Sequence, residues 1–393
     1  YQKKEGLVTK GRYIIKEIFF YISFIIVFSI VFLMLSLIRA HWYVFLAAGF
    51  CGVFLVFFRK SFYYRGFIKV ISWIMALIIP LTGMVYFRAE KNVSARGVLL
   101  RESIGYMTRL PSLSGARMMF TTEDLLNNMH FWKAPKGYTL KVIEKDGIYM
   151  EELSYEHSQT QDIILQLHGG GYIIGFMDIY RHTALMYSKA GGGAKVFSLD
   201  YRTAPEHTFP AALDDAMTAW QWLLDAGYKP ENIIVAGDSA GGNLALALTA
   251  KLRDQKSPLP KALILMSPWT DMAGQGPSHI YNQNKDAIFG NKNGVVNNID
   301  GKSNPYAGDT DLKDPYLSPV YGDFEGFPPM LIQVGSHEVL ESDSLTVAEK
   351  AQKDGVDVTL TRYEGMFHVF QLAGNLLPES KKAWQEVAEY LKN

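Results

Sequence analysis

A single serine, Ser239, stands between an aspartate and small residues in the stretch GDSAG, Gly237 to Gly241. The apolar, β-branched stretch NIIV precedes it, and NLALALTAKL, with apolar residues at helical spacing, follows it. This context matches the nucleophile-elbow pattern G-x-S-x-G, in which a strained strand-to-helix turn exposes the serine oxygen at the end of a sheet. The stretch therefore predicts that Ser239 is a catalytic nucleophile.

A glycine-rich stretch, LHGGGYIIG from Leu167 to Gly175, ends an earlier apolar run. Attack on an ester carbonyl creates an oxyanion, and backbone N–H groups of a glycine loop can reach it without side-chain obstruction. We expect the amides of Gly169, Gly170 and Ala240 to form this oxyanion hole. Gly171 is expected to permit the turn.

A serine hydroxyl needs a base to take its proton and an acid to orient that base. With a nucleophile elbow, the order along the chain is Ser, acid, His, and only His279, His337 and His368 follow Ser239. His279 lies in a polar insertion, where we expect it to be exposed or to contact a lid. His337 is directly beside the candidate acids. We predict that His368, which follows the last expected strand, is the base.

The loop GSHEVLESDS offers three carboxylates, Glu338, Glu341 and Asp343. Glu338 is closest to the end of the preceding apolar strand, where the partner of the histidine is needed. Asp343 stands before SLTVAEKAQ, as a helix N-cap would. We predict Glu338 as the catalytic acid and keep Asp343 as the alternative.

These residues need a scaffold, and the sequence after residue 137 alternates between strand and helix patterns. The expected strands are YTLKVIE, IYMEELSY, QDIILQLHG, AKVFSLDY, NIIVAGD, ALILMSPW, PMLIQVG and DVTLTRYEG. Such alternation predicts an α/β catalytic domain over 138–393 with a mainly parallel sheet flanked by helices. A Gly-, Asn- and Asp-rich interruption near 271–319 is expected to be a cap insertion. Short amphipathic patterns predict juxtamembrane and cap helices over 91–137.

Three uncharged apolar runs occupy the first quarter of the chain, Ile18 to Ile38, Tyr43 to Phe58 and Val70 to Phe87. A helix needs roughly 17 to 25 apolar residues to cross a bilayer. We therefore predict a membrane segment over residues 1–90 with three transmembrane helices. Basic residues gather before the first run and between the second and third, so the positive-inside bias places the catalytic domain outside the cytoplasm of a cell-membrane protein.

Composition limits the remaining possibilities. Lys and Arg total 39, as do Asp and Glu, so charge gives no reason to expect nucleic acid as a partner. The single cysteine, Cys51, excludes an intrachain disulfide and a cysteine metal cluster. The predicted chemistry requires neither a metal nor a cofactor. The expected partners are a small ester substrate and a lipid bilayer, and no particular oligomeric state is predicted.

Several motifs together resemble the hormone-sensitive lipase group of α/β-hydrolases, a family of esterases and lipases. They are HGGGY, DYRTAPEHTFPAALDDA, GDSAGGNLALAL, SPWTDM and GMFHVFQL, and the resemblance covers 138–393. It implies an α/β-hydrolase fold, an oxyanion hole at Gly169, Gly170 and Ala240, and catalytic roles for Ser239 and His368. The usual acid motif has Asp where this chain has Glu338.

The resemblance also implies a cap made by the helices before the sheet. Methionine and aromatic residues of this region, which we expect to line an acyl pocket, are Met107, Met118, Met119, Phe120 and Trp132.

The combined prediction is a membrane-anchored serine carboxylesterase or lipase-like hydrolase that cleaves short-chain esters through an acyl-enzyme intermediate. One alternative uses the same site in an extracytoplasmic deacetylase of acetylated glycans or amides. The other alternative is a membrane sensing or transport module with a hydrolase-like binding domain.

Overall fold

The computed structural model describes residues 85, 88–108, 132–290 and 305–392. The chain divides into two compact units, Tyr1–Glu90 and Lys91–Asn393. Apart from Val85, the three predicted transmembrane segments lie outside the described residues. Within the described ranges, no helix is both long enough and apolar enough to cross a bilayer.

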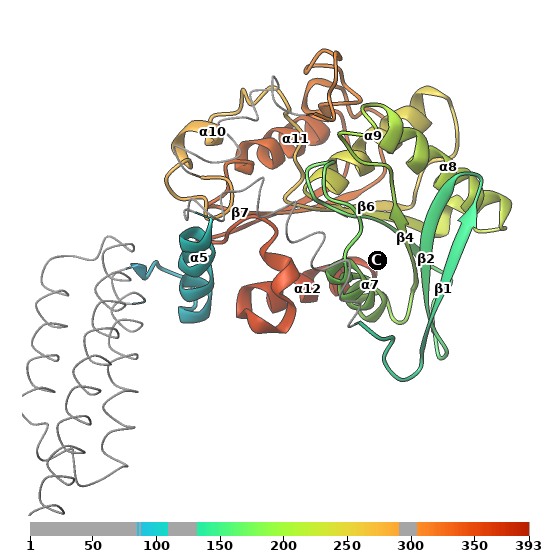
Figure 1. The fold of residues 1–393 in the computed structure, drawn as a ribbon, viewed down its shortest axis with the longest axis horizontal. Helices are drawn as coiled ribbons and strands as arrows, with labels where there is room; N and C mark the ends of the chain where they lie inside the picture. The colour runs from blue at the N-terminus through green and yellow to red at the C-terminus, as the bar shows by residue number, and fades with distance from the viewer. Residues whose placement is uncertain (1–84, 86–87, 109–131, 291–304, 393) are drawn as a thin grey trace, which may run out of the picture. The chain divides into compact units, whose positions relative to one another are not determined.

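The second unit is built on an eight-stranded sheet with the order β1-β2-β4-β3-β5-β6-β7-β8 (Figure 1). The strands are β1 (Tyr138–Lys145), β2 (Ile148–Tyr155), β3 (Ile163–Leu167), β4 (Lys195–Asp200), β5 (Ile233–Asp238), β6 (Ala262–Met266), β7 (Met330–Gly335) and β8 (Val358–Tyr363). Strand β2 pairs antiparallel with β1 and β4, whereas the pairs from β4 to β8 are parallel. All eight expected strands are present, and the predicted mainly parallel α/β sheet is confirmed.

Helices cover both faces of this sheet (Figure 1). The helices of the described residues are α5 (Ala95–Met107), α7 (Asp178–Ala190), α8 (Ala211–Asp225), α9 (Ala240–Asp254), α10 (Ser278–Tyr281), α11 (Glu341–Lys353) and α12 (Pro378–Tyr390). Helices α8, α9 and α11 share one hydrophobic cluster with the sheet, and α7 and α12 share another.

The central strands are apolar on both faces because both faces are covered. In β3, Ile163 and Leu165 belong to the α8, α9 and α11 cluster, while Ile164 belongs to the α7 and α12 cluster. Successive side chains of a strand point to opposite faces, so one short run of apolar residues supplies both cores.

The carboxyl ends of β5, β7 and β8 bring distant parts of the chain to one edge of the sheet. Ser239 follows β5, Glu338 follows β7 and His368 follows β8. Parallel strands end at the same edge, and this is where α/β proteins of this kind bind ligands.

Ser239 occupies a strained turn between β5 and α9. Its φ is 53° and its ψ is −120°, and its N–H donates to the Met266 carbonyl at 2.9 Å. Left-handed φ values are rare outside glycine, and they persist only where surrounding structure enforces them. The backbone on either side of Ser239 is tightly packed, because a Cβ added at Gly237 would lie 2.3 Å from the Gly241 carbonyl oxygen.

Gly241 is even more tightly enclosed, and its substitution tests how strongly the turn constrains the fold. In Gly241→Ala, the new Cβ would lie 2.0 Å from the Leu167 oxygen and 2.5 Å from the His168 oxygen, both backbone atoms at the end of β3. We expect the free energy of unfolding to fall by about 3 kcal/mol or more.

The control is Gly355→Ala, where φ is +85° but no atom lies within 4 Å of the added Cβ. Backbone strain alone should cost about 1–2 kcal/mol there. Both variants are compared with the native chain by unfolding followed through tryptophan fluorescence. Equal losses in the two variants would contradict the steric explanation.

Candidate active site

Three side chains from different loops form a continuous hydrogen-bonded row at the carboxyl edge of the sheet. His368 Nε2 lies 2.9 Å from Ser239 Oγ, and His368 Nδ1 lies 2.8 Å from Glu338 Oε2. Ser239 is 6% exposed, His368 is 4% exposed and Glu338 is fully buried. The structure thus brings together the predicted nucleophile, base and acid in a geometry suited to nucleophilic catalysis.

The Glu338 carboxylate has two sets of partners. Oε1 accepts hydrogen bonds from the Ser267 hydroxyl at 2.8 Å and from the Gly335 N–H at 2.5 Å, which leaves Oε2 for His368. Burial raises the pKa of Glu338, while His368 and the two donors counteract part of that rise. These contacts fix the carboxylate and the imidazole orientation that depends on it.

The alternative acid, Asp343, belongs to a second buried pair. Its Oδ1 lies 2.9 Å from His279 Nε2, and its Oδ2 accepts the N–H groups of Thr270 and Asp271, each at 2.9 Å. Burial by itself lowers the pKa of His279, but the neighbouring carboxylates, above all Asp343, give a net increase. Asp343 therefore holds His279 and not His368.

The structure contradicts two features expected of this second pair, an exposed His279 and an N-cap at Asp343. His279 is only 5% exposed, because the insertion packs inward against the residues after β7. Asp343 is not a helix N-cap, because α11 begins at Glu341 and Leu340 occupies the cap position. A carboxylate in the first turn of a helix can point away from that helix, and Asp343 does so to satisfy amides of the opposite loop.

The HGGG loop lies against the residue before the nucleophile, since a Cβ on Gly169 would lie 2.3 Å from Asp238 Oδ2. Among the described residues, the amides of Gly169, Gly170, Gly171 and Ala240 have no hydrogen-bond acceptor, which leaves them available to a substrate oxygen. The three amides predicted to form the oxyanion hole, those of Gly169, Gly170 and Ala240, are among them.

Asp238 is a buried carboxylate beside the nucleophile that the sequence analysis did not single out. It is 4% exposed, and burial raises its pKa to about 7 against the opposing effects of His368 and the Gly169 amide. Its place in the GDSAG motif beside the nucleophile was the available signal. Two strand ends meet at this carboxylate, because it ends β5 and contacts the loop that follows β3.

The environment of the imidazole also includes an aromatic ring that was not anticipated. The centroid of the Phe289 ring lies 4.7 Å from that of the His368 ring, at an interplanar angle of 57°. Of the five residues expected to line an acyl pocket, only Trp132 has a described side chain. It packs against the cluster of α7 and α12. The other four are Met107, Met118, Met119 and Phe120, and their side chains lie outside the description.

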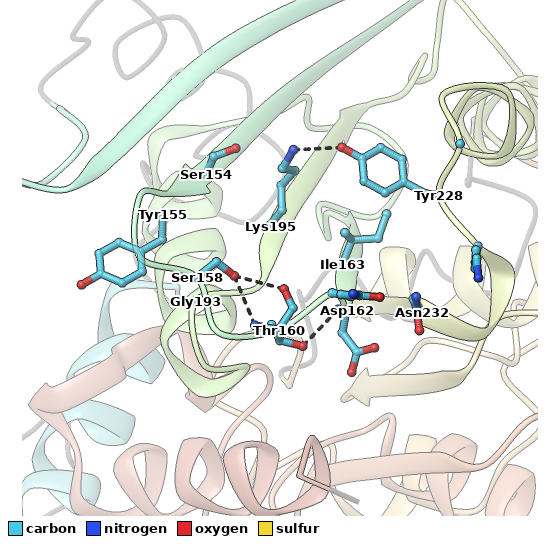
Figure 2. A pocket seen from close by; sticks show the side chains of 13 residues that line it. Ser154, Tyr155, Ser158, Thr160, Asp162, Ile163, Gly193, Lys195, Tyr228 and Asn232 are labelled. Atoms are coloured by element: carbon cyan, nitrogen blue, oxygen red, sulfur yellow. Dashed lines mark hydrogen bonds between the residues drawn. The ribbon is translucent and has the colours of Figure 1, made fainter.

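A polar hollow lies at the other end of the strands (Figure 2). It is lined by residues at the starts of parallel strands, including Ile163, Lys195 and Asn232. Its polar side chains bond one another, as when Lys195 donates to the Tyr228 hydroxyl at 2.9 Å. Because these residues lie at the amino ends of the parallel strands, the hollow is separate from the carboxyl edge that carries Ser239.

Comparisons with known proteins agree with this geometry. A family model described as the alpha/beta hydrolase fold matches residues 164–372. An acetyl-hydrolase of Streptomyces hygroscopicus is 38% identical over 229 residues, 58% of this chain and 75% of the relative. An esterase of Acinetobacter venetianus is 38% identical over 259 residues, 65% of this chain and 83% of the relative. The crystal structure of an esterase from the bacterial hormone-sensitive lipase family superimposes with a TM-score of 0.68 at 32% identity, covering 76% of this chain and 98% of that protein.

The buried Asp238 predicts a pH dependence of stability. Its pKa in the folded chain, about 7, exceeds its ordinary value of 3.8, so the folded state retains a proton that the unfolded chain releases. The stability that this proton provides is complete below the ordinary pKa and is lost as the pH rises through about 7. Asp238→Asn has nearly the same shape as the native side chain and cannot ionise.

We expect the Tm of Asp238→Asn, relative to the native chain, to increase between pH 5 and pH 8, by an amount corresponding to roughly 2 kcal/mol. Asp225→Asn at the exposed end of α8 controls for the loss of one surface charge. A Tm difference for Asp238→Asn that is identical at both pH values would show that Asp238 does not titrate in this range.

Proposed function

We propose that this chain, which belongs to the family with the α/β-hydrolase fold, cleaves short-chain esters through an acyl-enzyme intermediate. The premise is that it is a serine ester hydrolase of the carboxylesterase type. The observation that carries the proposal is the buried row of Ser239 Oγ, His368 and Glu338 at the carboxyl edge of the sheet. Each distance in that row lies within hydrogen-bonding range.

In the proposed reaction, Ser239 Oγ attacks the ester carbonyl carbon while His368 Nε2 takes its proton. Glu338 accepts the hydrogen bond from Nδ1 and stabilises the imidazolium that forms. The tetrahedral intermediate collapses, and His368 returns the proton to the departing alcohol. Water, activated by the same imidazole, then attacks the acyl-enzyme and regenerates the serine.

The oxyanion requires donors that are not already engaged. The amides of Gly169, Gly170 and Ala240 meet this condition, and we assign them to the oxyanion hole. Gly171, at φ +65°, permits the turn of the loop. Ala240 lies in the first turn of α9, where amides have no intrahelical acceptor and the helix dipole favours negative charge.

Short acyl groups are the proposed substrates. The similar protein of Streptomyces hygroscopicus is named an acetyl-hydrolase, which supports a small acyl group. The Phe289 ring beside His368 adds apolar surface close to the reacting atoms, which favours an ester over a charged substrate.

Membrane anchoring is the second part of the proposal. Its support is the three apolar runs within residues 1–90 and the basic residues that flank them. In this arrangement the hydrolase domain lies outside the cytoplasm and acts on esters at or near the membrane surface.

Ester turnover by the full chain tests the catalytic assignment. We expect Ser239→Ala to reduce hydrolysis of p-nitrophenyl acetate to the uncatalysed rate, and Glu338→Gln to lower kcat by about 10³–10⁴-fold. For the native chain, kcat/KM should fall from acetate and butyrate to palmitate. The matched control is Asp343→Asn, which alters the other buried acid–histidine pair and should keep kcat within about tenfold. Activity retained by Ser239→Ala would refute the mechanism.

Chemical labelling tests the topology. The native chain has one cysteine, Cys51, inside the second apolar run, and Lys353 is exposed at the end of α11. In sealed right-side-out vesicles, a membrane-impermeant maleimide should label Lys353→Cys and not the native chain, and alkaline carbonate should leave both in the membrane. Labelling of Lys353→Cys only after the vesicles are broken would place the domain on the cytoplasmic side.

A further inference from the structure

Helix α5 carries a buried arginine that contacts two catalytic loops at once. Arg101 is 3% exposed, and its Nη1 donates to the Gly365 carbonyl at 2.9 Å and lies 3.1 Å from His337 Nδ1. An arginine has no acceptor atoms, so Nδ1 accepts and His337 carries its proton on Nε2. Nε and Nη2 lie 3.3 Å from Glu102 Oε1, which balances the charge. Arginine is rarely buried unless it is paired in this way.

The two contacted residues lie close to the catalytic acid and base in the chain. His337 directly precedes Glu338, and Gly365 is three residues before His368. One guanidinium nitrogen therefore connects the loop after β7 with the loop after β8.

These loops also contact each other directly. Ser336 N–H donates to the Tyr363 carbonyl at 2.9 Å, and His337 N–H donates to the Met366 carbonyl at 3.0 Å. Gly365 N–H donates to the Ser336 hydroxyl at 2.7 Å. These bonds join the two loops into one layer, and Arg101 connects that layer to α5.

Helix α5 reaches the imidazole by a second route. The Thr108 hydroxyl, just after the end of α5, donates to the Ala287 carbonyl at 2.7 Å. Ala287 is two residues before Phe289, whose ring packs on His368. At the other end of α5, a Cβ on Gly97 would lie 2.9 Å from Met366 Cε, so the helix packs closely on the histidine loop.

We propose that Arg101 is a positioning residue for ester hydrolysis, and that through it α5 sets the distance between His368 and Glu338. This proposal deepens the proposed function and rests on it. Sub-ångström displacement of the imidazole weakens proton transfer without removing any group that binds the ester, so the effect falls on kcat. Helix α5 begins soon after residue 90, so the element that follows the predicted membrane segment also orients the catalytic base.

The test compares Arg101→Met with Arg96→Met in the full chain. Both variants remove one positive charge from α5, but Arg96 is exposed whereas Arg101 contacts the loops. Active sites are counted with a fluorophosphonate that reacts with the serine, so rates refer to folded enzyme. We expect kcat for p-nitrophenyl acetate to fall about tenfold in Arg101→Met with KM within twofold, and no change in Arg96→Met.

A coupled variant separates positioning from general stabilisation. His337→Leu removes one acceptor of Arg101 and should lower kcat in the same direction. If both residues act through one contact, Arg101→Met combined with His337→Leu should be no slower than Arg101→Met alone, within twofold. A lower Tm with native kcat per titrated site would overturn the proposal, as would multiplicative losses in the double variant. If Arg101→Met does not fold, Arg101→Lys replaces it. The proposal is then overturned if Arg101→Lys and His337→Leu both keep the native kcat.

Hydrogen exchange distinguishes failure of this proposal from failure of the proposed function. Absence of serine-dependent turnover in the native chain would refute the function itself. In either case, Arg101→Met should increase amide exchange at 336–340 and 363–369 relative to Arg96→Met. Unchanged amide exchange in both loops would overturn the positioning role of Arg101, whatever the activity of the variants.

Discussion

The close approach of α9 to the end of β3 is the constraint on which the site depends. Backbone meets backbone there, since a Cβ on Gly241 would lie 2.0 Å from the Leu167 oxygen. This contact places the first turn of α9, which begins after Ser239 with its φ of 53°, against the end of β3. Gly237 and Gly241 leave no room for a Cβ in this turn, so glycine at both positions allows the nucleophile and the first amides of α9 to lie where they do.

Burial of carboxylates is the main electrostatic cost of this arrangement. Three buried carboxylates offset the loss of hydration with different sets of partners. Glu338 has an imidazole, a hydroxyl and an amide as partners, and Asp343 has an imidazole and two amides. At Asp238, His368 and nearby backbone amides only partly oppose the increase in pKa that burial causes. With less compensation, desolvation dominates at Asp238 and raises its pKa to about 7, into the range where ester hydrolysis is usually measured.

Local pattern was sufficient to predict the strands and to nominate the nucleophile, base and acid. Each of these signals lies within a few residues of a strand end. The carboxyl ends of parallel strands lie at the same edge of the sheet, so residues at these ends come close together. The features that were missed depend on contacts between distant segments. Arg101 meets Gly365 across 264 positions, and His279 meets Asp343 across 64. Charge and spacing around Arg101 or His279 carry no information about which loop will cover them, so the sequence could not show that His279 is buried.

The strand order also determines when the site can exist during synthesis. Ser239 and the HGGG loop follow β5 and β3 in the middle of the described sheet, whereas β8 lies at its edge beside β7. His368 follows β8, 129 positions after Ser239, so the ribosome completes the serine well before the base that activates it. The catalytic row can therefore form only after β8 has paired with β7 and brought His368 to the serine.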